Sequence, residues 1–302
     1  QADPTDYYGE RSRQLIAGEP ILNPPAPYDL GYDLSAERAE AEAWMRTTFN
    51  IPANSDLSGP AEMAGDPNFQ RGNQFWQLSQ YTAARAEFET LRQRVSSDPV
   101  NTFRLMNHLL ELGMYRPAIL SARQILDLAF LDDAATLTAP KYFNHIRFGV
   151  YFRELVLPEA QAMNIHPFVL LSLIRQESAF EATIVSGSGA IGLMQLLPGT
   201  GTEMANSLGW PAGFSATDLY RPLVNVRLGS RYLKRQLDYF GDLYAALSAY
   251  NGGPGNTIFW QALSPTDPDL FVELIRFEET RHYIRQIVEY VNLYRLIYQR
   301  LN

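Results

Sequence analysis

Apolar residues recur at helical spacing in the stretch PFVLLSLIRQESAF, residues 167–180. The opening proline suits the first turn of a helix, where its missing N–H has no cost. The apolar face that this helix would bury consists of Val169, Leu170, Leu173 and Ile174. We therefore predict a buried helix that ends close to Glu177.

The same period appears elsewhere in the C-terminal half of the chain. Four further stretches show it: 142–164, 222–241, 242–250 and 280–301. Gly241 is expected to end the second of these, and the loop NGGPGN the third. No convincing pair of alternating strands is visible, apart from a possible short hairpin at 181–195. The pattern predicts an all-α fold.

The first part of the chain alternates loops with helices. Residues 35–49, SAERAEAEAWMRTTF, indicate a helix with Ser35 as its N-cap. The proline-rich stretches 17–36 and 51–70 on either side are expected to be loops. The opening residues read like the tail of a helix, so we expect the chain to continue a longer protein.

An internal repeat follows. YTAARAEF begins at Tyr81 and YRPAILSAR at Tyr115, 34 residues later, and the same shift places Ala84 on Ala118. This period is typical of tetratricopeptide-like helix pairs, whose apolar faces are covered by neighbouring pairs. Such helices either support the rest of the protein or guide a substrate.

The glycine-rich stretch SGSGAIGLMQ, residues 186–195, spells G-x-G-x-x-G, the fingerprint of dinucleotide-binding loops. That fingerprint requires a strand before it and a helix that opens on it. Here a helical stretch comes before it, and a proline and a glycine interrupt the chain soon afterwards. We interpret Gly189 and Gly192 as parts of a loop that passes close to a ligand and presents Met194 and Gln195.

Composition narrows the function further. The chain has 302 residues and a net charge of −8 without any block of Lys or Arg, which argues against nucleic acid as a partner. It has no cysteine, and its four histidines show neither a His-x-His nor a His-Glu-x-x-His pattern, so we expect no metal and no cofactor. No apolar run approaches the length of a membrane span, so we expect no transmembrane segment.

Glu177 is the candidate acid. The negative end of a helix dipole and the apolar neighbours Ile174 and Phe180 both favour its protonated form. A carboxyl group that stays protonated near neutral pH can give a proton to the leaving oxygen of a glycoside. Position alone favours the ordinary alternative, a solvated glutamate at a helix end.

Later segments favour the catalytic interpretation, because they are rich in side chains that hold sugars. AYNGGPGN places Tyr250 and Asn251 before a glycine loop, and a tyrosine offers both a ring and a hydroxyl group to a sugar. VELIRFEETRHY adds Glu279, Arg281 and Tyr283 near the start of the last helix. Each residue has an ordinary explanation, but together they indicate a saccharide groove.

From about residue 150 to 300 the chain resembles the catalytic domain of the soluble lytic murein transglycosylases, which have a lysozyme-like fold. Five motifs appear in the family's order: QESAF, GAIGLMQ, NVRLGSRYL, AYNGGPGN and ETRHY. The resemblance implies that residues 141–302 are the lysozyme-like catalytic domain. Residues 1–140 would be a helical-repeat region, the C-terminal part of a longer superhelical domain. It also implies an extracytoplasmic location.

The activity implied by this resemblance is cleavage of peptidoglycan glycan strands. The bond is the β-1,4 link between N-acetylmuramic acid and N-acetylglucosamine, and the product carries a 1,6-anhydromuramic acid end. Glu177 would act as general acid and then as general base, oriented by Ser178 and Tyr250. The residues implied to bind the glycan are Gly189, Gly192, Met194, Gln195, Asn251, Glu279 and Tyr283.

The chain departs from the family at two positions. Arg276 precedes Phe277 where a proline is common, and His166 stands where an aspartate is common. Two alternatives also stay open. One is a lysozyme-type hydrolase on the same fold, which would hold a water molecule opposite Glu177. The other is an inactive scaffold that binds peptidoglycan.

Overall fold

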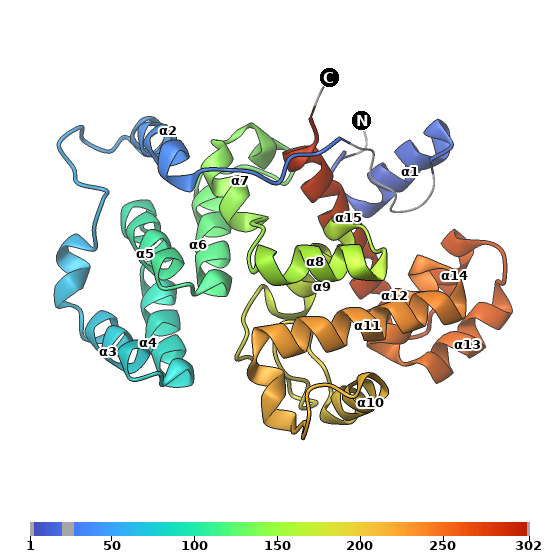
Figure 1. Ribbon diagram of the computed structural model, residues 1–302. Coiled ribbons are helices and arrows are strands. Elements are labelled where there is room, and N and C mark those ends of the chain that lie inside the picture. Colours follow the sequence, from blue (N-terminus) through green and yellow to red (C-terminus); the bar gives the residue numbers. More distant parts are fainter. Residues whose placement is uncertain (1–2, 20–26, 301–302) are drawn as a thin grey trace. The chain divides into compact units, whose positions relative to one another are not determined.

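The computed structural model describes residues 3–19 and 27–300 (Figure 1). Within these ranges it contains fifteen α-helices and three short 3₁₀ helices, and extended residues pair only in isolated bridges. The expected all-α fold is confirmed. The chain packs as two compact units. Leu30–Tyr151 form what we call the repeat unit, and the residues up to Asp29 together with those from Phe152 onward form the site unit.

The helices of the repeat unit are α2 (Leu34–Thr48), η1 (Ala61–Gly65), α3 (Pro67–Gln77), α4 (Tyr81–Arg94), α5 (Pro99–Glu111), α6 (Tyr115–Leu128), η2 (Ala135–Thr138) and α7 (Lys141–Arg147). The N-cap of α2 is Asp33 and not Ser35, because the Asp33 carboxylate accepts hydrogen bonds from the backbone N–H groups of Ser35 and Ala36. Part of the loop expected at 17–36, residues 20–26, lies outside the described residues.

The repeat expected from the sequence is a pair of helical hairpins. Helix α3 packs against α4, and α5 against α6. Helices α4 and α6 begin at Tyr81 and Tyr115, the two positions that the 34-residue shift matches. Ala84 and Ala118, one turn into these helices, are both fully buried in the core of the repeat unit. The matched positions therefore mark the helix starts and the small residues at the helix contacts.

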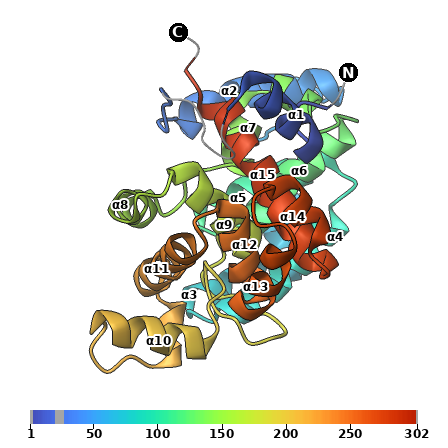
Figure 2. The same cartoon turned by 90° about the vertical axis from the view of Figure 1, so that its right-hand side faces the viewer.

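The helices of the site unit are α1 (Tyr7–Ala17), α8 (Arg153–Met163), α9 (Pro167–Ser178), α10 (Pro198–Leu208), η3 (Ala216–Tyr220), α11 (Pro222–Phe240), α12 (Leu243–Gly252), α13 (Pro254–Leu263), α14 (Pro268–Leu274) and α15 (Glu278–Tyr298). Helix α9 packs against α8 and α15, while α12 packs against α11, α13 and α15 (Figure 2). The packing of α9 against two neighbouring helices explains why the residues from Phe168 to Ile174 and Ser178 are buried.

Packing groups the chain differently from the expected division into 1–140 and 141–302. Helix α7 contributes Tyr142, Phe143 and Ile146 to the core of the repeat unit. Helix α1 packs on α15 in the site unit, where Tyr7 is buried. The first helix thus joins the C-terminal part of the chain, although more than a hundred residues separate them in sequence.

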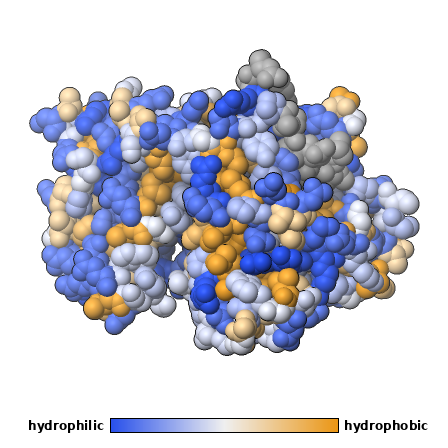
Figure 3. All heavy atoms as spheres, in the orientation of Figure 1, coloured by the Kyte–Doolittle hydropathy of each residue, from blue (hydrophilic) through white to orange (hydrophobic). Residues whose placement is uncertain are grey.

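Polar and apolar residues are interspersed over the face shown in Figure 3. The exposed large apolar side chains are spread over many elements, among them α1, α13 and α14. In the described part of the chain, no helix combines the length and the hydropathy needed to cross a membrane.

Candidate active site

Glu177 lies in the last turn of α9, as the sequence predicts. The helix begins at Pro167 and ends at Ser178, after which Ala179 and Phe180 both adopt left-handed backbone conformations, with φ of 49° and 64°. Phe180 turns into the core and is 1% exposed. The turn places an acidic side chain at the C-terminal end of a buried helix, where the helix dipole opposes its ionisation.

His166 explains how α9 tolerates one departure from the family. It is the N-cap of the helix, and its Nδ1 atom accepts a hydrogen bond of 3.2 Å from the backbone N–H of Phe168. Burial lowers the pKa of His166 to about 4, which keeps Nδ1 free to accept. The histidine therefore does the capping that an aspartate would do at this position.

The Glu177 carboxyl group is held by a tyrosine from the last helix. The Tyr283 hydroxyl donates a hydrogen bond of 2.5 Å to Glu177 Oε1. The pKa of Glu177 is raised to about 7 as the net result of three effects: burial raises it, the hydrogen bond from Tyr283 lowers it, and the negative charge of Glu279 raises it. Burial is the largest effect, so a substantial fraction of Glu177 stays protonated at neutral pH.

Ser178 and Tyr250, the residues expected to orient Glu177, make their hydrogen bonds to the glycine-rich loop. The Ser178 hydroxyl donates to the carbonyl oxygen of Leu193 at 2.8 Å, and the Tyr250 hydroxyl donates to that of Met194 at 2.7 Å. Burial and the nearby Glu177 both raise the pKa of Tyr250 well above its usual value, so this phenol stays protonated. The direct contact to the carboxyl group comes from Tyr283 instead.

The glycine-rich loop forms a hairpin-like turn, with isolated bridges from Ile191 to Val185 and to Leu196. Gly189 and Gly192 have positive φ angles of 83° and 81°, which favour glycine. A Cβ atom would meet nothing within 4 Å at Gly189, but at Gly192 it would lie 2.4 Å from Asn225 Nδ2. The loop follows helix α9 rather than a strand, so its surroundings differ from those of a dinucleotide site.

The other predicted binding residues differ in exposure. Met194 is fully buried, so its side chain supports the loop from the protein interior. Gln195 is half-buried and donates through Nε2 to the carbonyl oxygen of Gly192 at 2.8 Å. Asn251 is half-buried as well, and its Oδ1 accepts a hydrogen bond of 2.7 Å from Thr280. Glu279, the neighbour of Thr280, is exposed.

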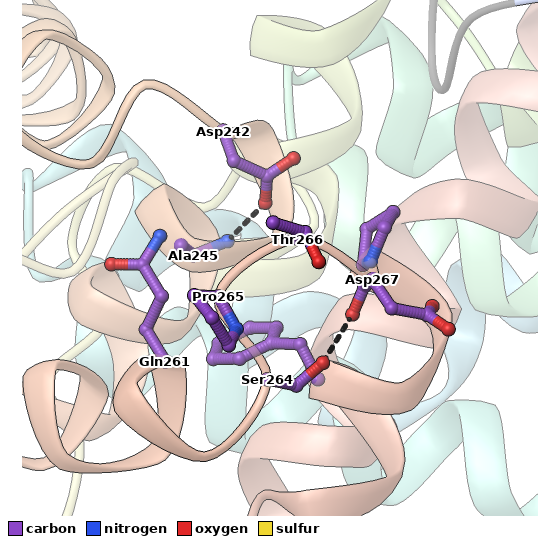
Figure 4. A pocket seen from close by; sticks show the side chains of 9 residues that line it. Asp242, Ala245, Gln261, Ser264, Pro265, Thr266 and Asp267 are labelled. Atoms are coloured by element: carbon purple, nitrogen blue, oxygen red, sulfur yellow. Dashed lines mark hydrogen bonds between the residues drawn. The ribbon is translucent and has the colours of Figure 1, made fainter.

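A separate hollow of about 110 Å³ lies at the N-terminal end of α12 (Figure 4). Its walls include Asp242, which caps α12 through the N–H of Ala245, and Ser264, whose hydroxyl donates to the carbonyl oxygen of Asp267. Tyr250 lies eight residues along the same helix, about 12 Å away at 1.5 Å per residue. Within residues 3–19 and 27–300, no cluster of three acidic or histidine side chains could hold a metal ion.

The family described as Transglycosylase SLT domain matches residues 154–269. This part of the chain is similar to a transglycosylase SLT domain. The matched range of the SLT domain includes Glu177, the glycine-rich loop and Tyr250, while Glu279 and Tyr283 lie beyond its end. The resemblance to the soluble lytic murein transglycosylase family is thereby confirmed.

Relatives of the SLT domain have similar names. The soluble lytic murein transglycosylase of Escherichia coli is 33% identical over 163 residues, which are 52% of this chain and 25% of that protein. The membrane-bound lytic murein transglycosylase C of Yersinia enterocolitica is 32% identical over 116 residues, 35% of this chain and 32% of that protein. The chain thus spans about a quarter to a third of the length of these relatives.

Solved structures extend the similarity beyond the SLT domain. An inactive mutant of the lytic transglycosylase Slt from Pseudomonas aeruginosa has a TM-score of 0.66 and 28% identity, covering 97% of this chain and 41% of that one. The 70 kDa soluble lytic transglycosylase of Escherichia coli has a TM-score of 0.64 at 21% identity, covering 96% and 45%. The second likeness concerns the fold alone. Together they cover the repeat unit as well as the site unit.

Proposed function

We propose that the protein is a lytic transglycosylase that cleaves peptidoglycan glycan strands at the β-1,4 bond between N-acetylmuramic acid and N-acetylglucosamine. The observation that carries the proposal is the state of Glu177, a carboxyl group with a pKa of about 7 at the end of a buried helix. A general acid with a pKa near the working pH combines enough protonated form with enough acidity. The SLT domain and the names of its relatives support the choice of substrate.

In the first step, Glu177 protonates the glycosidic oxygen and the bond to the anomeric carbon breaks. The N-acetyl group of the muramic acid or nearby dipoles stabilise the positive charge on the sugar. In the second step, the ionised Glu177 takes the proton of the carbon-six hydroxyl, whose oxygen attacks the anomeric carbon and closes the 1,6-anhydro ring. An intramolecular nucleophile is favoured by an effective molarity that reaches about 10⁵ M in well-oriented cases.

The surrounding residues would divide the work between orientation and binding. Tyr283 orients the Glu177 carboxyl group through its hydrogen bond. Gln195 and Asn251 are half-buried and Glu279 is exposed, so we assign all three to binding of the sugars, and Glu279 to binding rather than to proton transfer.

Other site residues would shape the groove without taking part in proton transfer. Ser178 and Tyr250 fix the glycine-rich loop, and Gly189 and Gly192 give this loop its turn. Met194 supports the loop from the core. With peptidoglycan as the proposed substrate, we expect the protein to act outside the cytoplasm.

Replacement of Glu177 by glutamine tests the proposal. Glu177→Gln keeps the shape of the side chain and removes its proton, so we expect cleavage of purified peptidoglycan to fall about 10²- to 10⁴-fold with the fold intact. Glu181→Gln, four residues further on, is the control and should stay active. A folded Glu177→Gln variant with the wild-type rate would refute the role of Glu177.

Mass spectrometry of the released fragments distinguishes the two chemistries. A transglycosylase leaves 1,6-anhydro ends, and these fragments are lighter by one water than those of a lysozyme. Reducing muramic acid ends as the main product would show that water, and not the sugar hydroxyl, is the nucleophile.

A further inference from the structure

One face of α11 packs against the loop that carries Met194 and Gln195. Asn225, Gly229 and Tyr232 follow one another at spacings of four and three residues, so they share this face. They are the asparagine, the glycine and the tyrosine of NVRLGSRYL. We call these three residues the α11 cradle, because each of them contacts the loop or the tyrosine bound to it.

Asn225 fixes the backbone of the loop. Its side chain is fully buried, and Oδ1 accepts a hydrogen bond of 2.7 Å from the N–H of Met194. Its Nδ2 donates to the carbonyl oxygens of Ile191 at 2.7 Å and Leu219 at 2.9 Å. Removal of this amide would take away the hydrogen bonds of the Met194 N–H and of the Leu219 carbonyl oxygen, which is costly, whereas the Ile191 carbonyl oxygen would still accept from the N–H of Leu196 at 3.1 Å.

Gly229 and Tyr232 contact the Met194 side chain and the Tyr250 ring, to which Asn225 makes no hydrogen bond. A Cβ atom at Gly229 would lie 2.5 Å from Met194 Sδ and 2.8 Å from Met194 Cβ, so only glycine leaves room for this buried side chain. The ring of Tyr232 lies 5.2 Å from the ring of Tyr250, centroid to centroid. The cradle therefore contacts both the backbone and the side chain of Met194, and it contacts the ring of Tyr250.

The loop in turn holds two residues that belong to the surroundings of Glu177. The carbonyl oxygen of Met194 accepts the hydrogen bond of Tyr250, and that of Leu193 accepts the hydrogen bond of Ser178. Ser178 is the residue that follows Glu177 at the end of α9. A continuous set of contacts thus leads from α11 through the loop to Tyr250 and to Ser178, the residue next to the candidate acid.

We infer that Asn225, Gly229 and Tyr232 are positioning residues for the reaction. They hold the glycine-rich loop, and through it Tyr250 and Ser178, in the arrangement that Glu177 requires. This inference rests on the proposed function. The competing explanation is that the cradle only stabilises the fold, and the two explanations differ in what a variant does to the chemical step.

Asn225→Ala removes all three hydrogen bonds at once. We expect kcat on peptidoglycan to fall about 10²-fold, because a displaced site loses rate more than affinity, with KM changed by less than about threefold. The control is Asn292→Ala. Asn292 is equally buried in α15 and donates to the carbonyl oxygen of Pro4 at 2.7 Å. Its loss should lower the melting temperature and leave kcat unchanged.

The pH profile separates positioning from stability. Loosening of Tyr250 and the loop admits water to Glu177, so the pKa of Glu177 falls and the alkaline limb of the profile moves to lower pH. Asn292→Ala should leave the limb in place.

Gly229→Ala tests the contact of the cradle with the Met194 side chain. Alanine in place of a helical glycine ordinarily stabilises a helix, but here its methyl group displaces Met194. We expect a lower kcat. The control is Gly199→Ala in α10, where a Cβ atom meets nothing within 4 Å.

Amide hydrogen exchange measures how firmly the cradle holds the loop, and it needs no substrate. The Met194 N–H should exchange at least about tenfold faster in Asn225→Ala than in the wild type. If the wild-type protein cleaves no peptidoglycan, the proposed function fails, whatever the exchange rates are. If the wild type cleaves and Asn225→Ala keeps its kcat and pH profile, the positioning role is overturned and the proposed function stands.

Discussion

Glu177 has neighbours that act on its ionisation in opposite directions. Burial and the negative charge of Glu279 favour the protonated form, while the hydrogen bond donated by Tyr283 favours the carboxylate. The first step of the proposed reaction uses the protonated form. Activity should therefore fall as the pH rises through about 7, the pKa of Glu177.

Two single substitutions should move this limb in opposite directions. Tyr283→Phe removes the hydrogen bond to the carboxylate, so the pKa of Glu177 rises and the alkaline limb of kcat/KM moves to higher pH. Glu279→Gln removes a like charge, so the pKa falls and the limb moves to lower pH. Initial rates between pH 5 and pH 9, at about 0.1 M salt, measure both. Shifts of the same sign in the two variants would contradict this account.

The sequence identifies Glu177 because its signals are local: a helix end and apolar residues within a few positions. It does not reveal that Tyr283 holds the carboxyl group, because 106 residues separate the two. The contact of Tyr250 with Met194 spans 56 residues and is equally invisible to local patterns. Family resemblance indicates that these residues belong to one site, but only the packing of α15 against α9 and against α12 shows which residue contacts which.

At the scale of elements, the two glycines of the loop have the same backbone conformation and different surroundings. Both have φ near +80°, so a side chain is strained at either position. At Gly192 a Cβ atom would also collide with Asn225 and with the carbonyl oxygen of Leu219, while at Gly189 it would meet open space. The two positions thus separate backbone strain from steric collision.

Alanine substitutions at these glycines form a matched pair. Gly189→Ala should cost about 1 kcal/mol in the free energy of unfolding, from backbone strain alone. Gly192→Ala should cost more and should also lower peptidoglycan cleavage, because it displaces the buried Asn225 side chain. Urea denaturation and initial rates of both variants test this. Equal losses at the two positions would mean that the collision is absorbed elsewhere.

Helices were predictable where apolar residues recur at helical spacing over a long stretch and a proline or glycine marks one of its ends. Pro167 and Gly241 mark the start of α9 and the end of α11 as expected. The start of α2 was not predictable from residue type, since Asp33 and Ser35 are both good N-cap residues. Asp33 has the extended backbone that an N-cap requires, with φ of −127° and ψ of 98°, and this conformation cannot be read from the residue type.

At the scale of the whole molecule, α1 joins the site unit through contacts that span most of the chain. Arg11 makes a two-pronged ion pair with Asp269, at 2.7 and 2.9 Å. The backbone N–H of Tyr7 donates to Glu289 at 3.2 Å. The sequence assigned this region to the N-terminal repeats because it considered neighbours along the chain, and contacts over 250 residues or more leave no local pattern.

Tyr7 and Tyr8 provide a matched test of this docking. Tyr7 is 4% exposed and its ring lies 6.5 Å from that of Tyr244, whereas Tyr8 is 57% exposed. Tyr7→Ala should destabilise the protein by about 3 kcal/mol through the cavity that it leaves. Tyr8→Ala should change stability by less than about 1 kcal/mol. Thermal unfolding followed by circular dichroism compares them, and similar melting temperatures for the two variants would show that α1 is not docked as described.

The docking of α1 also imposes an order in time. Asn292 binds the carbonyl oxygen of Pro4 across 288 residues, a distance that a ribosome covers in about 15 to 60 s at 5 to 20 residues per second. Throughout that interval the buried face of α1 lacks its partner, although the repeat unit, with its short-range hairpins, can already fold. The first helix of the site unit to be synthesised is thus among the last to find its place. Aggregation of nascent chains is therefore expected to begin at the exposed apolar face of α1.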